Sequence, residues 1–189
     1  MGKITVETCG IEGLKVITPT VFGDERGYFM ETYQYLDFKE AGIDQVFVQD
    51  NQSASRKGVL RGLHFQINHP QDKLVRVVSG EVFDVAVDIR KGSATYGKWF
   101  GARLSAENKK QFFIPKNFAH GFIVLSDYAE FTYKCSDYYH ANDEGGIAFN
   151  DPELAIDWPM PEGFTADDLV ISEKDRKWGS FSEFTKAYR

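Results

Sequence analysis

Cysteine is scarce in this chain of 189 residues, and long apolar runs are absent. The two cysteines, Cys9 and Cys135, are too few for a disulfide framework and lack the spacing of metal ligands. No apolar run approaches the roughly 20 residues that a membrane-spanning helix needs. Residues 1–30 contain no basic-then-apolar signal peptide. We therefore expect a soluble, cytoplasmic protein that makes no use of a membrane.

Positive charge is also in short supply. Lys and Arg number 22 against 28 Asp and Glu, which gives a net charge of −6. Non-specific nucleic-acid binding depends on clustered cationic residues, so we expect no nucleic-acid partner, while a local basic pocket for one small anion remains compatible with this balance. The chain has no glycine-rich phosphate loop, no dinucleotide fingerprint and no Gly-x-Ser-x-Gly elbow, so nothing in it indicates those three kinds of site.

What the chain does contain is strand-type periodicity, with apolar residues recurring mostly at every second position. The expected strands are 11–17, 22–31 around a turn signal at Gly23-Asp24, 47–51, 59–66, 74–78, 81–89, 98–104, 111–114, 121–125 and 129–134, with a short apolar piece at 169–171. Two short helical segments are expected, one at 36–41 and one carrying Phe181, Phe184 and Tyr188. This pattern predicts an all-β sandwich or barrel, of which the jelly roll is one form, in one domain over 1–189 with a C-terminal extension.

Residues 81–89 show the alternation most clearly. The odd positions Phe83, Val85, Val87 and Ile89 are apolar, whereas the even positions Val82, Asp84, Ala86 and Asp88 are smaller or acidic. We expect one face of this strand to pack in a core and the other to meet something polar.

The stretch 59–89 carries more charge than a buried strand usually does. Arg61 and His64 lie within four residues of each other, and Lys73 begins the next apolar run. Charged groups leave water only when something pairs them. These side chains therefore either line a ligand cavity or form ion pairs with Glu81, Asp84 and Asp88.

Histidine is limited to His64, His69, His120 and His140. A metal site in a small β-barrel usually draws two ligands from same-face positions of one strand, but the residue two after His64 is Gln66, a poor ligand. We therefore expect no metal. Acid–base chemistry remains, because a neutral histidine can accept a proton, a tyrosine can return one and a lysine can stabilise an enolate. Composition alone does not choose among the histidines and tyrosines present.

Several motifs together resemble the dTDP-4-dehydrorhamnose 3,5-epimerases, nucleotide-sugar epimerases of the cupin superfamily. The matching motifs are Phe22-Gly-Asp-Glu-Arg-Gly-Tyr-Phe, Val48-Gln-Asp-Asn51, Leu60-Arg-Gly-Leu-His-Phe-Gln66, Lys73-Leu-Val-Arg76, residues 80–90, Ile114-Pro, Phe118-Ala-His-Gly-Phe122, Asn150-Asp-Pro152 and Ser172-Glu-Lys-Asp175. The resemblance implies a jelly-roll (cupin) barrel, a homodimer, and no metal or other cofactor.

The resemblance also implies catalytic roles. His64 would take protons from C5 and C3 of a 4-keto sugar, and Asp175 would orient its imidazole. Tyr133 would reprotonate from the opposite face, and Lys73 would stabilise the enolate at O4. From the residues alone, Asp84 is a rival partner for His64, Asp175 could be a surface residue, and Tyr133 could belong to the core.

For substrate binding, the resemblance implies a larger set of side chains that hold the diphosphate, sugar and thymidine. They are Arg26, Glu31, Gln49, Asn51, Arg61, His120, Glu144, Lys174 and Tyr139, the last of which would stack on the base. Two simpler interpretations stay open: Arg26 and Glu31 could form a surface ion pair, and Glu144 could be exposed in the loop 142–146.

One geometric problem arises in the motif around His64. Arg61 and His64 are three residues apart, so in a regular strand they would face opposite sides. We expect either a bulge at Gly62 or a strand that ends at Arg61. Departures from the family pattern are Ala94, Phe149 and the segment Ile67-Asn-His-Pro70, and a shifted 67–72 loop could change sugar selectivity.

The leading function is double epimerisation of dTDP-4-keto-6-deoxyglucose, feeding L-rhamnose synthesis. A mono-epimerase on a related nucleotide sugar is the first alternative, and a 3,4-ketoisomerase is a weaker one. A sugar- or metal-binding cupin without catalytic activity would share the barrel.

Overall fold

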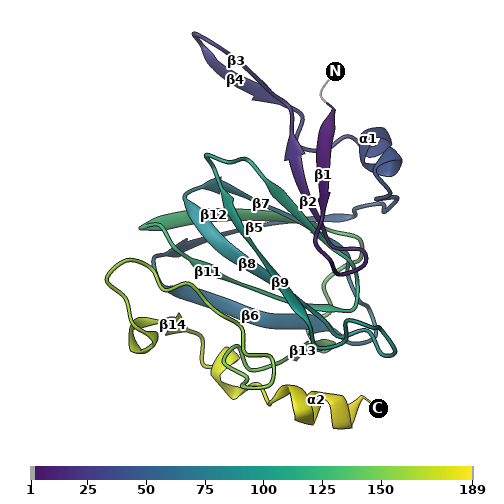
Figure 1. The fold of residues 1–189 in the computed structure, drawn as a ribbon, viewed down its shortest axis with the longest axis vertical. Helices are drawn as coiled ribbons and strands as arrows, with labels where there is room; N and C mark the ends of the chain where they lie inside the picture. Colours follow the sequence, from purple (N-terminus) through teal and green to yellow (C-terminus); the bar gives the residue numbers. More distant parts are fainter. Residues whose placement is uncertain (1–2, 189) are drawn as a thin grey trace.

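The computed structural model describes residues 3–188, most of which lie in or between antiparallel strands (Figure 1). One sheet has six strands in the order β1(Ile4–Thr8), β2(Lys15–Pro19), β10(Gln111–Ile114), β7(Lys73–Ser79), β12(Tyr128–Cys135) and β5(Gln49–Arg56). The other has β13(Glu144–Gly146), β6(Val59–Gln66), β11(Phe118–Val124), β8(Glu81–Asp88) and β9(Trp99–Ser105), with β14(Val170–Ile171) pairing parallel to β6. The prediction of an all-β jelly-roll barrel of the cupin type is confirmed.

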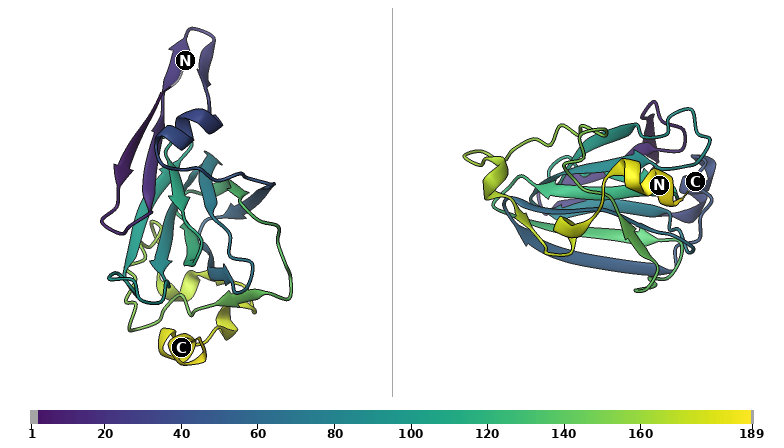
Figure 2. Two further views of the ribbon diagram at one scale, coloured as in Figure 1. Left: turned by 90° about the vertical axis from the view of Figure 1, so that its right-hand side faces the viewer. Right: turned by 90° about the horizontal axis from the view of Figure 1, so that it is seen from below.

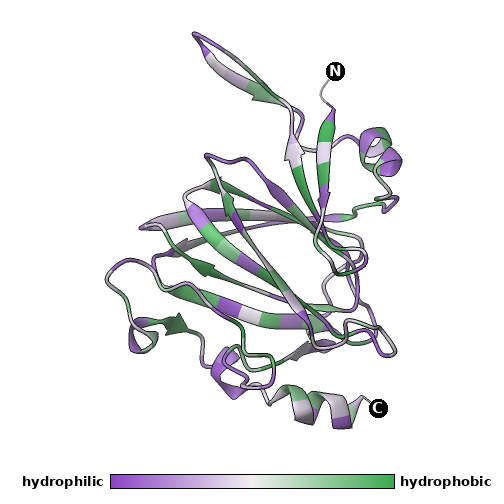
Figure 3. Cartoon of the chain, viewed as in Figure 1, coloured by the Kyte–Doolittle hydropathy of each residue, from purple (hydrophilic) through white to green (hydrophobic). Residues whose placement is uncertain are grey.

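Two main hydrophobic clusters result from the alternation along these strands (Figure 3). One lies inside the barrel and includes Val75, Phe112 and Phe131. The other includes Leu63, Val85 and Trp158, together with residues of the C-terminal segment. Strand β8 serves both: Val82 and Ala86 pack in the first, while Val85 and Val87 pack in the second. The expected two-faced strand is confirmed, although both of its faces are buried.

The N-terminal part departs from the barrel. Strands β3(Val21–Asp24) and β4(Gly27–Met30) form a separate two-stranded hairpin that projects from the body (Figures 1 and 2). The short helix α1(Tyr35–Glu40) follows, with Gln34 capping its N-terminus and Phe38 buried beneath it. This helix lies one residue from its predicted position.

The C-terminal segment runs along the other end of the barrel (Figure 2). It contains the 3₁₀ turns η1(Ala166–Asp168) and η2(Asp175–Lys177) and ends in helix α2(Phe181–Ala187). A capping box between Ser180 and Glu183 starts α2, and Phe181 anchors it in the core. The helical spacing of Phe181 and Phe184 therefore predicted α2 correctly.

Three predictions about strands were wrong. The strand expected at 11–17 begins at Lys15, because residues 11–13 form a turn, and β1 before it was not predicted. The hairpin turn lies at Glu25-Arg26, two residues after the expected Gly23-Asp24. The strand expected at 47–51 is β5, which runs to Arg56 through almost entirely polar residues.

No helix among residues 3–188 is long and apolar enough to cross a bilayer.

Candidate active site

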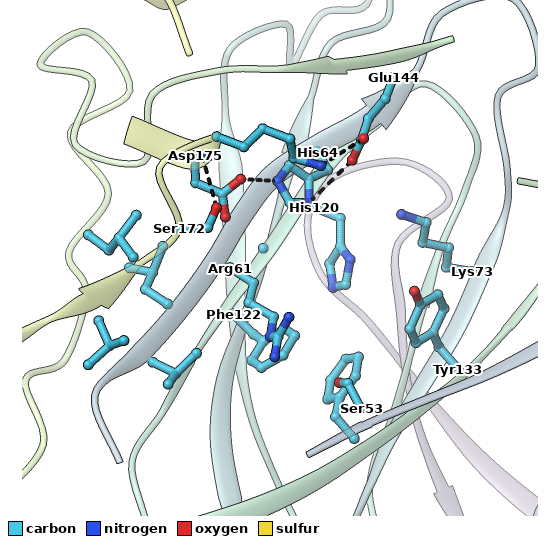
Figure 4. A pocket seen from close by; sticks show the side chains of 17 residues that line it. Ser53, Arg61, His64, Lys73, His120, Phe122, Tyr133, Glu144, Ser172 and Asp175 are labelled. Carbon is cyan, nitrogen blue, oxygen red and sulfur yellow. Dashed lines mark hydrogen bonds and ion pairs between the residues drawn. The ribbon is translucent and has the colours of Figure 1, made fainter. Parts of the chain in front are cut away.

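A cavity of about 680 Å³ opens between the two sheets, at the end of the barrel reached by the C-terminal segment. Predicted site residues on β6, β7, β11, β12, β13 and the segment around η2 line it. They are Arg61, His64, Lys73, His120, Tyr133, Glu144, Lys174 and Asp175 (Figure 4). Segments more than 100 residues apart in the sequence thus contribute to one site.

Strand β6 brings both Arg61 and His64 to this cavity through an irregularity at Gly62 and Leu63. His64 pairs with His120 of β11, and Arg61 pairs with Phe122, so three steps along β6 match two along β11. The extra residue is a bulge, which is one of the two predicted arrangements. Gly62 has a φ of 125°, and its Cα faces the backbone of Gly121 at close range. Arg61 then donates from Nε and Nη2 to Ser55 Oγ at 3.2 and 3.1 Å.

Replacing Gly62 with alanine is expected to destabilise the fold by about 2 kcal/mol. A Cβ there would lie 2.5 Å from Gly121 Cα and 2.8 Å from His120 O, and the positive φ disfavours any side chain. Chemical denaturation would measure the loss. G163A is the control, because Gly163 has a φ of 80° but a Cβ there would meet no atom within 4 Å. Its expected loss of stability, about 1 kcal/mol, comes from backbone strain alone. Equal losses in the two variants would contradict the close approach at Gly62.

His64 and Asp175 form the shortest polar contact of the cavity, with Nε2 and Oδ1 2.6 Å apart (Figure 4). The Asp175 side chain is only 4% exposed, so it is not the surface residue that the simpler interpretation allowed. It also accepts from Gly62 N, and its own N donates to Ser172 Oγ. Burial acts to raise the pKa of Asp175, but the hydrogen bond and charge of His64 prevail and lower that pKa below its ordinary value.

Asp84, the rival partner for His64, lies elsewhere. It is fully buried and contacts His120 Nε2 through both carboxylate oxygens, at 3.0 and 2.9 Å. Burial raises the pKa of Asp84, while the neighbouring His120 and Lys73 act against that increase. The even-numbered face of β8 therefore meets a polar group, as expected, but that group is His120.

Tyr133 and Lys73 face His64 across the cavity (Figure 4). Lys73 Nζ lies 5.9 Å from the centre of the Tyr133 ring. Burial raises the pKa of Tyr133, which keeps its hydroxyl protonated at neutral pH. Burial lowers the pKa of Lys73, and the charges of Asp84 and Glu144 partly oppose this. Tyr133 also packs against the barrel core, so the two interpretations of this residue are compatible.

Glu144 begins β13 with its side chain 16% exposed, and it is not a free loop residue. Its Oε2 accepts from Lys174 Nζ at 2.7 Å and from Tyr139 OH at 3.2 Å, and its Oε1 lies 3.9 Å from His64 Nδ1. His64 thus lies between two carboxylates, with Asp175 much closer. Tyr139 itself is exposed at the rim.

Strand β5 contributes the remaining polar wall. Its odd positions face inward, and Gln49 donates to Asn51 Oδ1 and accepts from Tyr139 N, both at 3.0 Å. Asn51 lines a second cavity of about 390 Å³, which shares Tyr133 with the first. Ser53 and Ser55 were missed by the sequence analysis, although polar residues at every second position from Gln49 onward were a usable signal.

Arg26 and Glu31 are not brought to the cavity of this chain. Arg26 lies at the hairpin tip and pairs with Asp24 at 2.5 Å, so the simpler interpretation of an Arg26–Glu31 ion pair is also wrong. Glu31 follows β4 at the base of the hairpin.

The unusual 67–70 segment is tied to the loop before Glu144. The Asp143 carboxylate accepts from Asn68 N, Asn68 Nδ2, His69 N and His69 Nδ1, and the His69 ring stacks on His140 with centroids 3.9 Å apart. Burial acts to raise the pKa of Asp143, yet the hydrogen bonds from Asn68 and His69 lower it to about 2. The segment therefore helps to place Tyr139 and Glu144.

We expect D143N to lower the melting temperature at pH 7, because the ionised Asp143 accepts bonds that an amide cannot all accept. A lowered pKa in the folded state means that this stabilisation is complete above the unfolded pKa, near 3.9, and is lost as the pH falls towards 2. Melting curves of both proteins should therefore converge in acid. D157N, at an exposed aspartate, serves as the control. A difference that persists unchanged at pH 2 would contradict the account of Asp143.

Within residues 3–188, no three His, Cys, Asp or Glu side chains are arranged to hold a metal ion. Cys9 and Cys135 are both free thiols. What the arrangement offers is a carboxylate-bound imidazole facing a protonated phenol and a lysine side chain inside one cavity. Together, the barrel and this site define a cupin-type protein built for proton transfer.

Comparisons with known proteins agree with that class. A family model described as dTDP-4-dehydrorhamnose 3,5-epimerase matches residues 8–183. An epimerase of that name from Methanothermobacter thermautotrophicus is 56% identical over 92% of both chains, and one from Pseudomonas aeruginosa is 57% identical over 87% of this chain and 89% of its own. The chain therefore belongs to the dTDP-4-dehydrorhamnose 3,5-epimerase family.

Solved structures support the same conclusion. The epimerase of Legionella pneumophila, crystallised in complex with dTDP-4-keto-L-rhamnose, superimposes with a TM-score of 0.90 at 53% identity. The match covers 95% of this chain and 93% of that one.

Proposed function

We propose that this protein epimerises C3 and C5 of dTDP-4-dehydro-6-deoxy-D-glucose, giving dTDP-4-dehydro-L-rhamnose for dTDP-L-rhamnose biosynthesis. The observation that carries the proposal is the 2.6 Å contact between His64 and Asp175, in the same cavity as Tyr133 and Lys73. Both carbons flank one carbonyl, so proton removal and return suffice to invert them. The activity named for the similar epimerases supports this assignment.

His64 is the base in this proposal, and its two nitrogens have different tasks. Nε2–H donates to the ionised Asp175, which leaves the lone pair on Nδ1 to take the proton next to the carbonyl. After transfer, the imidazolium is stabilised by Asp175 at one nitrogen and by Glu144, 3.9 Å away, near the other. The same base serves C5 and then C3.

Tyr133 returns a proton to the opposite face of the planar enolate, and this change of face inverts the carbon. Its raised pKa keeps the donor protonated until an enolate is present. Lys73 lies near Tyr133 and stabilises the charge that develops on O4. Burial makes that charge interaction stronger than it would be in water.

The remaining side chains of the cavity and its rim bind the substrate. Arg61 and Lys174 are placed to neutralise the diphosphate, and the exposed Tyr139 offers a ring for the thymine base. The other proposed contacts are His120, Glu144, Gln49 and Asn51.

The direct test is incubation of the purified protein with dTDP-4-keto-6-deoxyglucose, followed by NMR of the product. Coupling constants around the ring report the configuration at each carbon. The proposal expects both C3 and C5 to be inverted. Inversion at one carbon would indicate a mono-epimerase, and an unchanged sugar that still binds would indicate a binding cupin without catalytic activity.

We further propose a homodimer in which each hairpin reaches the partner. A lone two-stranded hairpin is marginally stable in water, yet β3–β4 leaves Phe22, Tyr28 and Phe29 exposed at 49, 60 and 64%. A symmetric pair would cover these rings on both subunits. It would also explain how Arg26 and Glu31, which do not line the cavity of their own chain, can take part in substrate binding.

F29E is therefore expected to halve the solution mass measured by light scattering. It should also weaken dTDP binding by about tenfold, because separated subunits lose the charge-assisted contact of Arg26. M160E is the control, because it introduces the same charge at another exposed apolar residue that lies away from the hairpin. The solution mass and the dTDP affinity of M160E should match those of the wild type. A dimeric F29E with normal affinity would contradict the proposed role of the hairpin.

A further inference from the structure

Trp178 lies beside His64 and has no part in the proton transfers described above. The two ring centroids are 6.3 Å apart, with the planes inclined at 68°, so one ring meets the other edge-on. Trp178 directly follows η2, the turn that begins with Asp175. One short turn therefore supplies both the carboxylate on Nε2 of His64 and an aromatic ring next to the same imidazole.

Gly146 provides the surface on which this indole rests. Gly146 is paired with His64 in the β13–β6 register, so it is a direct cross-strand neighbour of the base. A Cβ at Gly146 would lie 2.3 Å from Cε2, 2.4 Å from Cδ2 and 2.5 Å from Nε1 of Trp178. No real Cβ makes such contacts, so the indole can lie here only because residue 146 has no side chain.

Packing holds the indole in this place. Its Nε1 is buried and has no hydrogen-bond partner among the described residues. The backbone on either side is anchored: Ala148 N donates to Gly179 O at 2.8 Å, and Ile147 N donates to Leu63 O at 3.0 Å. The indole therefore lies over Gly146 of β13 and beside the base, on backbone that is anchored to β6 and β13.

We propose that Trp178, seated on Gly146, is a positioning residue that fixes the plane of the His64 imidazole. Asp175 holds one nitrogen but leaves the ring free to rotate about that contact. The indole blocks this rotation and keeps Nδ1 directed at the substrate. This inference rests on the proposed function of His64, and misplacing a base by about 1 Å can cost a large factor in rate.

A double-mutant cycle of G146A and W178A tests the proposal. Each single variant is expected to lower kcat about tenfold, since the ring is displaced in one and absent in the other. KM should stay near the wild-type value, because neither residue lines the cavity. In the W178A background, G146A should have almost no further effect, because the methyl group then meets no indole.

The position of the indole ring is measured independently of the reaction rate. NMR of the His64 ring protons detects the ring current of Trp178, and their resonances should move in G146A as well as in W178A, whether or not the protein turns over. Melting temperatures report folding, and W178F replaces W178A if the latter does not fold. An inactive wild type would reject the proposed function but still allow this NMR test.

The proposal is overturned if G146A costs the same factor in both backgrounds, or if the His64 resonances do not respond to either change. It is also overturned if the variants raise KM and leave kcat unaltered.

Discussion

H64A is expected to lose proton exchange at the sugar ring while binding dTDP almost as tightly as the wild type. General-base catalysis by a positioned side chain is worth about a thousandfold in rate, so kcat should fall by at least that factor. Arg61, Lys174 and Tyr139 are untouched by the change, so affinity for the nucleotide should persist. Deuterium exchange gives the rate, and calorimetry gives the affinity.

A matched control exists within the same chain. H140A removes an exposed imidazole that stacks on His69 outside the cavity. Its exchange rate should stay close to that of the wild type. Turnover retained in H64A would reject His64 as the base, and a parallel loss of dTDP binding would show that the substitution had damaged the site as a whole.

Y133F is expected to separate proton removal from inversion. The phenyl ring keeps the packing against Phe131, whose ring centre is 5.9 Å away, so the fold should be preserved. Without the hydroxyl, protons taken by His64 can return only from His64. Inversion should therefore fall by about a hundredfold, while solvent deuterium still enters with retained configuration.

NMR in D2O distinguishes the two outcomes because it reports label and configuration together. Tyr128 lies on the same strand, with its hydroxyl bonded to Glu130 at the exposed end of β12, so Y128F is the control. Inversion at the wild-type rate in Y133F would show that another group supplies the second proton.

The parts of the fold that followed from the sequence are those where apolar alternation is strong. Strand β8 carries apolar residues at every second position, so its two faces could be assigned in advance. Only the start of strand β5 was predicted, because its continuation over 52–56 contains no large apolar side chain. Strand β5 is stabilised by its pairing with β12. Because β12 is distant in the sequence, this contact leaves no local pattern in residues 49–56.

The site shows the same limit. The charged residues Arg61, His64 and Lys73 marked one stretch as unusual. The spacing of Arg61 and His64 left two arrangements, a bulge at Gly62 or a strand end at Arg61, and the structure has the bulge. The pairing of His64 with Asp175, 111 residues later, was accessible only through family resemblance. Family resemblance predicts that Arg26 binds substrate, but in a single chain Arg26 lies at the hairpin tip and not in the cavity.

The 67–72 loop illustrates what only the structure could add. Its residues looked like an isolated departure from the family pattern, yet Asp143 binds Asn68 and His69 and so connects them to Glu144. This connection depends on the Asp143 carboxylate, and nothing in the sequence of either loop indicates that the two loops are in contact.

In the proposed reaction, one cavity moves protons at both carbons next to the 4-keto group. Incubating the wild-type protein with dTDP-4-keto-6-deoxyglucose in D2O tests it most directly. We expect deuterium at C3 and C5 of the product. Deuterium at only one of these carbons, or at neither, would contradict it.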